Sequence, residues 1–160
     1  MHWAEYIHHV TLHFPIVLSF VLAVVGVWWV RTEDPRLATF VRWTGWVTLA
    51  MASATMLSGI VAAPGILGGD GPQGLSDHRN MGVLAWCAIA IATIAFEVGT
   101  RAGQRYVRRF AALCWIAAAV AVVGAGHWGG SALHSDKIPW QGTRPILSPE
   151  EPSPTEPGGV

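Results

Sequence analysis

Four long apolar runs, separated by short polar breaks, dominate the pattern of hydrophobic and polar positions along the chain. A membrane-spanning helix needs roughly 20 mostly apolar residues, and each run is about that long. The pattern therefore predicts helices at about residues 10–30, 40–63, 80–98 and 106–126. Turn-forming residues mark the breaks, and Ser76 or Asp77 is a suitable cap for the third helix. The breaks are Asp34-Pro35, the glycine-rich stretch after Pro64, Gly99 to Gly103, and Gly129-Gly130.

These runs predict an all-α fold, an integral membrane antiparallel four-helix bundle over residues 1–140. Residues 141–160 alternate proline with serine, threonine and glutamate, a composition that cannot bury enough apolar surface to fold alone. We expect this segment to be a disordered or partner-binding tail. The composition agrees with a membrane protein, because 52% hydrophobic and 12% charged residues would leave a soluble domain short of surface charge. Basic and acidic residues balance, so no basic field indicates nucleic acid.

Basic residues give the bundle a predicted orientation. Arginines gather at the first and third loops, and the positive-inside rule places such loops in the cytoplasm. Both chain ends are then expected on the opposite face. Several tryptophans lie near the predicted interfaces, whereas Trp86 and Trp115 lie deeper and are expected to pack inside. The clustered arginines are Arg31, Arg36, Arg42, Arg101, Arg105, Arg108 and Arg109.

All seven histidines fall at the end of the bundle opposite these arginines. A single histidine there is as readily an interfacial polar residue as a ligand. The convergence of several on one face favours a ligand site, because neutral imidazole binds haem iron, zinc and copper well. The best candidates are His13, His78, His127 and His134; the others are His2, His8 and His9.

Two glycines are consistent with haem, and equally with close packing of transmembrane helices, where glycine is common. Gly82 follows His78 by one helical turn, and Gly124 precedes His127 by one turn, so each leaves a helix face without a side chain where a flat porphyrin needs a wall. Arg79 is placed to pair with a haem propionate. We expect haem b, with iron ligands among His13, His78 and His127; C-x-x-C-H is absent, which excludes covalent attachment of a c-type haem.

Three stretches resemble the bacterial four-helix membrane domain-of-unknown-function 2231 family. The run from His8 to Ile16 is similar to its H-x-x-x-x-H-F-P-I opening, with His9 in place of a usual proline. The run from His78 to Gly82 resembles its H-R-x-x-G motif, and the run from Gly126 to His134 its G-H-x-G-G-x-L-x-H-G ending, with Ser135 in place of the last glycine. The matching histidines are His8, His13, His78, His127 and His134.

The resemblance implies a place in the bacterial inner membrane. The arginine loops then place the histidines and both termini on the periplasmic side. Similar members accompany c-type cytochromes, which implies electron transfer within a respiratory or other redox complex. We therefore expect a b-type cytochrome-like subunit, surrounded by membrane lipids, that takes electrons from a donor such as quinol. Two alternatives stay open: a cofactor-free structural accessory subunit, and a zinc or copper site. The sequence contains no hydrolase constellation, and a subunit role is therefore favoured over that of a stand-alone enzyme. Glu97, at the inner end of the third helix, is expected to be a snorkelling surface carboxylate.

Overall fold

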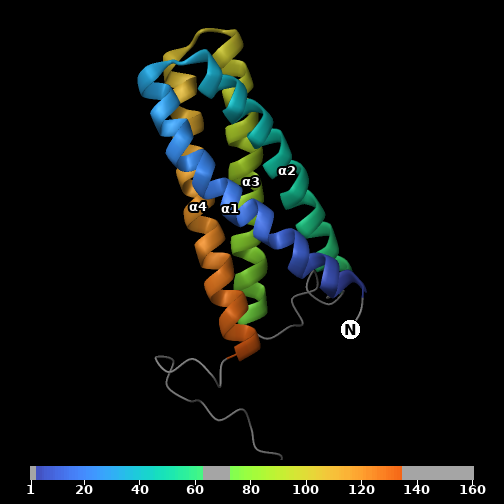
Figure 1. Ribbon diagram of the computed structural model, residues 1–160. Helices are drawn as coiled ribbons and strands as arrows, with labels where there is room; N and C mark the ends of the chain where they lie inside the picture. Colours follow the sequence, from blue (N-terminus) through green and yellow to red (C-terminus); the bar gives the residue numbers. More distant parts are fainter. Residues whose placement is uncertain (1–2, 63–72, 135–160) are drawn as a thin grey trace, which may run out of the picture.

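The computed structural model describes residues 3–62 and 73–134, which form four helices (Figure 1). They are α1 (Trp3–Thr32), α2 (Pro35–Ala62), α3 (Gln73–Arg101) and α4 (Arg105–His134). The prediction of an all-helical bundle of four long apolar helices is confirmed. The predicted tail at 141–160 and the glycine-rich stretch after Pro64 lie outside the described residues.

Each helix is longer than the apolar run that predicted it. At 28 to 30 residues, the helices are about 42–45 Å long. Ser76 and Asp77 therefore lie inside α3 instead of capping it, and α4 continues through Gly129-Gly130 to His134. Hydropathy marks only the roughly 30 Å of a helix that hydrocarbon would cover, whereas the backbone hydrogen bonds continue through polar turns on either side.

The break between α1 and α2 lies where Asp34-Pro35 predicted it. Glu33 ends α1 with its amide bonded to the carbonyl of Trp29 (2.7 Å) and a positive φ of 55°. The Asp34 carboxylate then accepts a hydrogen bond from the Arg36 amide (2.7 Å), so Asp34 is the N-cap of α2. Pro35 follows in the first helical position, where its missing N–H costs nothing.

The bundle consists of two helix pairs, α1 with α2 and α3 with α4. The second pair packs closely along its length, while α1 also crosses onto α4 and α2 touches α3 over a shorter stretch (Figure 1). Toward the end at which α1 begins, the two pairs diverge (Figure 1). This divergence decides which side chains face each other at that end.

One indole fills the middle of the core. Trp115 of α4 is 1% exposed and lies between two glycines of the other helix pair. A Cβ atom at Gly26 or at Gly45 would lie 3.2 Å from its ring, so both positions depend on having no side chain. The prediction that Trp115 packs inside the bundle is confirmed. Small residues such as Ala92 and Ala118 line the rest of the interface, as is typical of helices packed within a membrane.

The outer surface is apolar along the length of the bundle. Val24, Val61 and Val120 are 69%, 68% and 67% exposed, and many other large hydrophobic side chains point outward. Uncovered apolar surface on this scale is unfavourable in water. Each of the four helices is long and apolar enough to cross a membrane.

Candidate histidine site at one end of the bundle

Two histidine rings from different helix pairs lie together where the pairs diverge. His8 stands in the second turn of α1 and His78 in the second turn of α3. Their ring centroids are 6.4 Å apart, and the ring planes are inclined at 79°. The neighbouring His9 ring is 6.0 Å from His8. Residues from the first and third helices thus form one imidazole pair.

The His8 ring is held by α2. Its Nδ1 donates a hydrogen bond to the carbonyl oxygen of Thr55 (2.9 Å), and the Ser58 hydroxyl lies 3.5 Å from the same nitrogen. Gly59 provides room, since a Cβ atom there would lie 3.0 Å from the ring carbon Cε1. These residues share one face of α2, so the helix positions the ring with a single surface.

The His78 ring is held by α4 in the same way. Its Nδ1 donates a hydrogen bond to the carbonyl oxygen of Ala125 (2.7 Å). Gly129, one turn further on, lies against the ring, and a Cβ atom there would stand only 2.7 Å from Nδ1. Each helix pair therefore contributes one imidazole and its own support for it.

The two hydrogen bonds fix the chemistry of both rings. A carbonyl oxygen can only accept, so Nδ1 of each ring carries the hydrogen and Nε2 of the neutral ring carries the free lone pair. Imidazoles oriented by an Nδ1–H···O=C bond are the usual form of histidine metal ligands. Both rings are partly buried, which limits competition from water.

Two imidazoles are fewer ligands than a protein usually provides for a bare metal ion. Among the side chains that the structure describes, no three histidine, cysteine, aspartate or glutamate residues gather as a set of metal ligands. A structural zinc site uses four protein ligands and a catalytic one uses three. Haem iron needs only two axial ligands because the porphyrin supplies the others.

The other predicted ligands have different surroundings. His13 is exposed, and its Nδ1 donates to the carbonyl of His9 within the same helix (2.8 Å). His127 is also exposed, with its ring centroid 5.3 Å from that of Trp128. The backbone of His134 ends α4, and its side chain lies outside the described residues. Among the described histidine side chains, the structure thus brings His8 together with His78, and it shows no ring contact of His13 with another histidine.

The two glycines predicted to lie against a porphyrin, Gly82 and Gly124, have different surroundings. Gly82 has open space where a side chain would be, with no atom within 4 Å of a Cβ there. Gly124 is in close contact with Met81, whose sulfur would lie 3.2 Å from a Cβ, so its small size serves the packing of α3 on α4. The Arg79 guanidinium donates to the Asn80 side-chain oxygen (3.2 Å).

Sequence patterns missed the residues that hold the rings. Thr55, Ser58 and Gly59 lie inside the second apolar run, and Gly129 in a Gly-Gly pair that predicted a helix end. A small-residue face on α2 is the only signal that sequence offers. It has the same appearance whether the face meets a helix or an imidazole.

The opposite end of the bundle carries ion pairs between the helix pairs. Arg42 of α2 donates to the Glu97 carboxylate of α3 (2.8 Å), and Arg101 lies 3.6 Å from the same group. The Glu97 side chain is only 14% exposed, so the expectation of a snorkelling surface carboxylate is wrong. Glu33 pairs with Arg105 (3.4 Å) and Arg108 (3.3 Å) of α4.

Compared with protein-family models, curated proteins and solved structures, the chain matches none. The resemblance to the domain-of-unknown-function 2231 family therefore rests on its three motifs and stays a prediction.

Proposed function

We propose that the chain is a multi-pass inner-membrane subunit that holds haem b between His8 and His78 for electron transfer. The observation that supports this most is the pairing of the two imidazoles, each fixed through Nδ1 by a separate helix pair. Haem bound there would supply a one-electron couple. The protein would tune its potential through the axial ligands, their hydrogen bonds and burial.

The spacing of the two rings leaves room for a metal between them. Their centroids are 6.4 Å apart, and metal–nitrogen bonds are about 2.0–2.1 Å long. His8 and His78 would hold haem iron through Nε2, the nitrogen that the two Nδ1 hydrogen bonds leave free. Among the described side chains no third metal ligand joins them, which favours haem over the zinc or copper alternative because zinc sites use three or four protein ligands.

The face of α3 beside the pair would leave room for a flat group. Gly82, one turn along α3 from His78, leaves its face open. Both rings lie within the apolar spans, at Tyr6–Thr32 and Leu75–Arg101, where an ionisable side chain indicates a functional site by default.

The proposed topology is antiparallel, with the arginine loops in the cytoplasm and both termini in the periplasm. The charge distribution supports it, because Arg31, Arg36 and Arg105 lie at the end opposite His8 and His78. The haem would then lie near the periplasmic face. A c-type cytochrome or a larger redox complex is the proposed partner on that side, and quinol is a candidate donor from the membrane.

The cofactor-free accessory subunit remains the second candidate. One observation favours it: the His8 and His78 rings are also at a distance and angle suited to an edge-to-face aromatic contact. In that case the two hydrogen bonds and the ring contact would serve only to join the helix pairs.

Purification from haem-replete cells separates these functions. We expect a red protein with a reducible Soret band, about one haem and no stoichiometric zinc or copper. A colourless, metal-free protein that co-purifies with partner subunits would contradict haem binding and support the accessory role. Stoichiometric zinc or copper without iron would contradict it in favour of a metal-ion site.

A further inference from the structure

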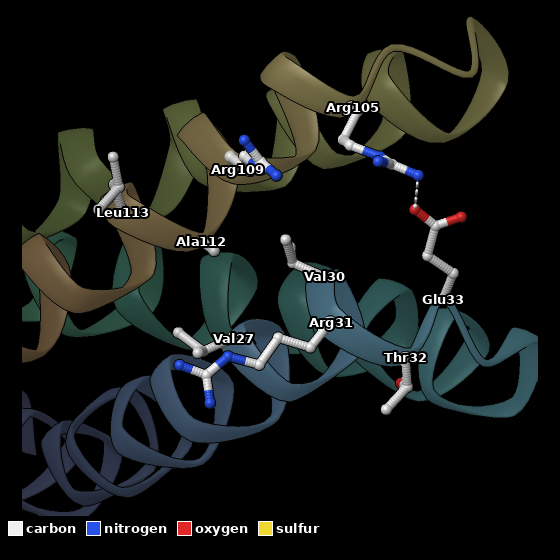
Figure 2. A pocket seen from close by; sticks show the side chains of 9 residues that line it. All are labelled: Val27, Val30, Arg31, Thr32, Glu33, Arg105, Arg109, Ala112 and Leu113. Atoms are coloured by element: carbon white, nitrogen blue, oxygen red, sulfur yellow. Dashed lines mark ion pairs between the residues drawn. The ribbon is translucent and has the colours of Figure 1, made fainter.

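A basic pocket lies between α1 and α4 at the arginine end (Figure 2). It has a volume of about 720 Å³ and is lined by the ends of both helices. Arg31, Arg105 and Arg109 surround it, while Val30 and Ala112 lie between the two helices (Figure 2). His8 precedes Arg31 by 23 residues of α1, which is about 35 Å of helix. This pocket is therefore separate from the histidine pair.

The charges of the pocket do not cancel. Three arginines and one carboxylate, that of Glu33, line it. Glu33 already pairs with both Arg105 (3.4 Å) and Arg108 (3.3 Å). Among the residues that the structure describes, Arg31 and Arg109 have no ion-pair partner. The pocket thus has a net positive charge next to the apolar side chains of Val30 and Ala112.

A second hollow continues from the pocket along α1. It has a volume of about 440 Å³ and shares Val27 and Arg31 with the first. Its remaining lining, Ala23, Val24 and Trp28, is apolar and leads toward the middle of the helix. The Arg31 side chain extends back along α1 toward Val27, so it lies where the basic and apolar parts meet (Figure 2). A charged end joined to an apolar track matches a ligand with a charged head and a hydrocarbon chain.

We propose that this site binds an anionic phospholipid. Its phosphate lies among Arg31, Arg105 and Arg109, and an acyl chain lies along Val27 toward Ala23. Arginine suits the head because its planar group binds phosphate oxygens in pairs, and basic pockets between membrane helices hold anionic lipid heads. The proposal rests on insertion in a membrane, but not on haem.

Native mass spectrometry of the full chain in detergent tests this site. Purified protein is titrated with cardiolipin, phosphatidylglycerol, phosphatidylcholine or inorganic phosphate. We expect retention of the two anionic lipids and little of phosphatidylcholine. Equal retention of all three lipids would overturn the proposal. Inorganic phosphate that displaces the anionic lipids at comparable concentration would also overturn it, because the site would then be one for free anions.

Matched arginine variants locate the site. The double variant Arg31→Gln/Arg109→Gln should bind cardiolipin roughly 20- to 30-fold more weakly, at about fivefold per arginine. Arg36→Gln/Arg101→Gln removes the same charge from exposed positions at the same end that do not line the pocket, and should bind nearly as the parent does. Equal losses in both variants would show a diffuse charge effect and refute the site.

The apolar track has its own test. Val27→Trp places a large ring where the two hollows meet and should weaken cardiolipin retention while leaving weak phosphate binding unchanged. Unchanged lipid retention in this variant would contradict the acyl-chain position. Circular dichroism and a single elution peak establish that each variant is folded. Haem content is expected to be the same in all of them, so failure of the lipid site and failure of the haem site are distinguishable.

Discussion

The two ends of the bundle use their polar side chains in opposite ways. At the arginine end, ion pairs run between the helix pairs, from Arg42 of α2 to Glu97 of α3 and from Glu33 to Arg108 of α4. At the histidine end, the hydrogen bonds of His8 and His78 stay within their own pairs. The protein itself ties the first end together. The second end presents two imidazoles, which the proposed haem would join.

The largest expected effect is loss of haem when either imidazole is removed. His8→Ala and His78→Ala should each leave less than about one tenth of the parent haem content, because loss of an axial ligand removes a coordinate bond to the iron. The controls are His9→Ala and His13→Ala, which lie on the same helix as His8 and are exposed. Pyridine haemochrome absorbance of equal amounts of purified protein measures the content.

Loss of haem in the His13 variant together with full retention in the His8 variant would reverse the assignment. Iron would then belong to a pair that includes His13, as the histidine pattern alone suggests. Full haem content in all four variants would contradict ligation by His8 and His78.

A smaller effect is expected from crowding a ring without removing it. In Gly129→Ala the new Cβ would lie 2.7 Å from His78 Nδ1, so the ring must shift and its bond to Ala125 must weaken. We expect haem affinity to fall about tenfold or more, as for other residues that orient a metal ligand. Gly126→Ala is the matched control, because a Cβ there meets no atom within 4 Å.

Haem transfer to apomyoglobin measures this affinity. Equal transfer rates from both glycine variants would mean that the hydrogen-bonded position of His78 has no bearing on haem binding.

The smallest effect is expected at the arginine end. Glu97→Gln leaves Arg42 without its carboxylate, and we expect the free energy of unfolding to fall by about 1–2 kcal/mol because Glu97 is mostly buried while Arg42 is partly exposed. Glu33→Gln, at a more exposed carboxylate, should cost less than about 1 kcal/mol. Thermal unfolding in detergent by circular dichroism gives the ranking. A larger loss in the Glu33 variant, or loss of haem in either, would contradict the separation of the two ends.

Hydropathy predicted the four helices because the length of an apolar run directly indicates whether it can cross a membrane as a helix. It could not predict their full extent, since turns such as the one around Ser76 continue α3 without apolar residues. The location of the histidines at one end also followed from the pattern, because it depends only on which helix end each residue is near.

The identity of the ring pair could not be predicted in the same way. His8 and His13 are five residues apart, which is about 140° around a helix. Only the packing of α1 on α2 decides that His8 faces Thr55 while His13 is exposed. Gly129 was similarly ambiguous, because a glycine suits a helix end and a close approach equally well. The structure shows the second role, against His78.

Electron paramagnetic resonance of the oxidised, haem-loaded protein tests the central claim most directly. Two imidazoles inclined at 79°, as His8 and His78 are, would give ferric haem a highly anisotropic low-spin signal. Parallel imidazole planes give a rhombic low-spin signal, and a single imidazole ligand leaves the iron high-spin. We predict the highly anisotropic signal in the parent protein and its loss in His8→Ala. A high-spin spectrum from the fully loaded parent would contradict ligation by both histidines.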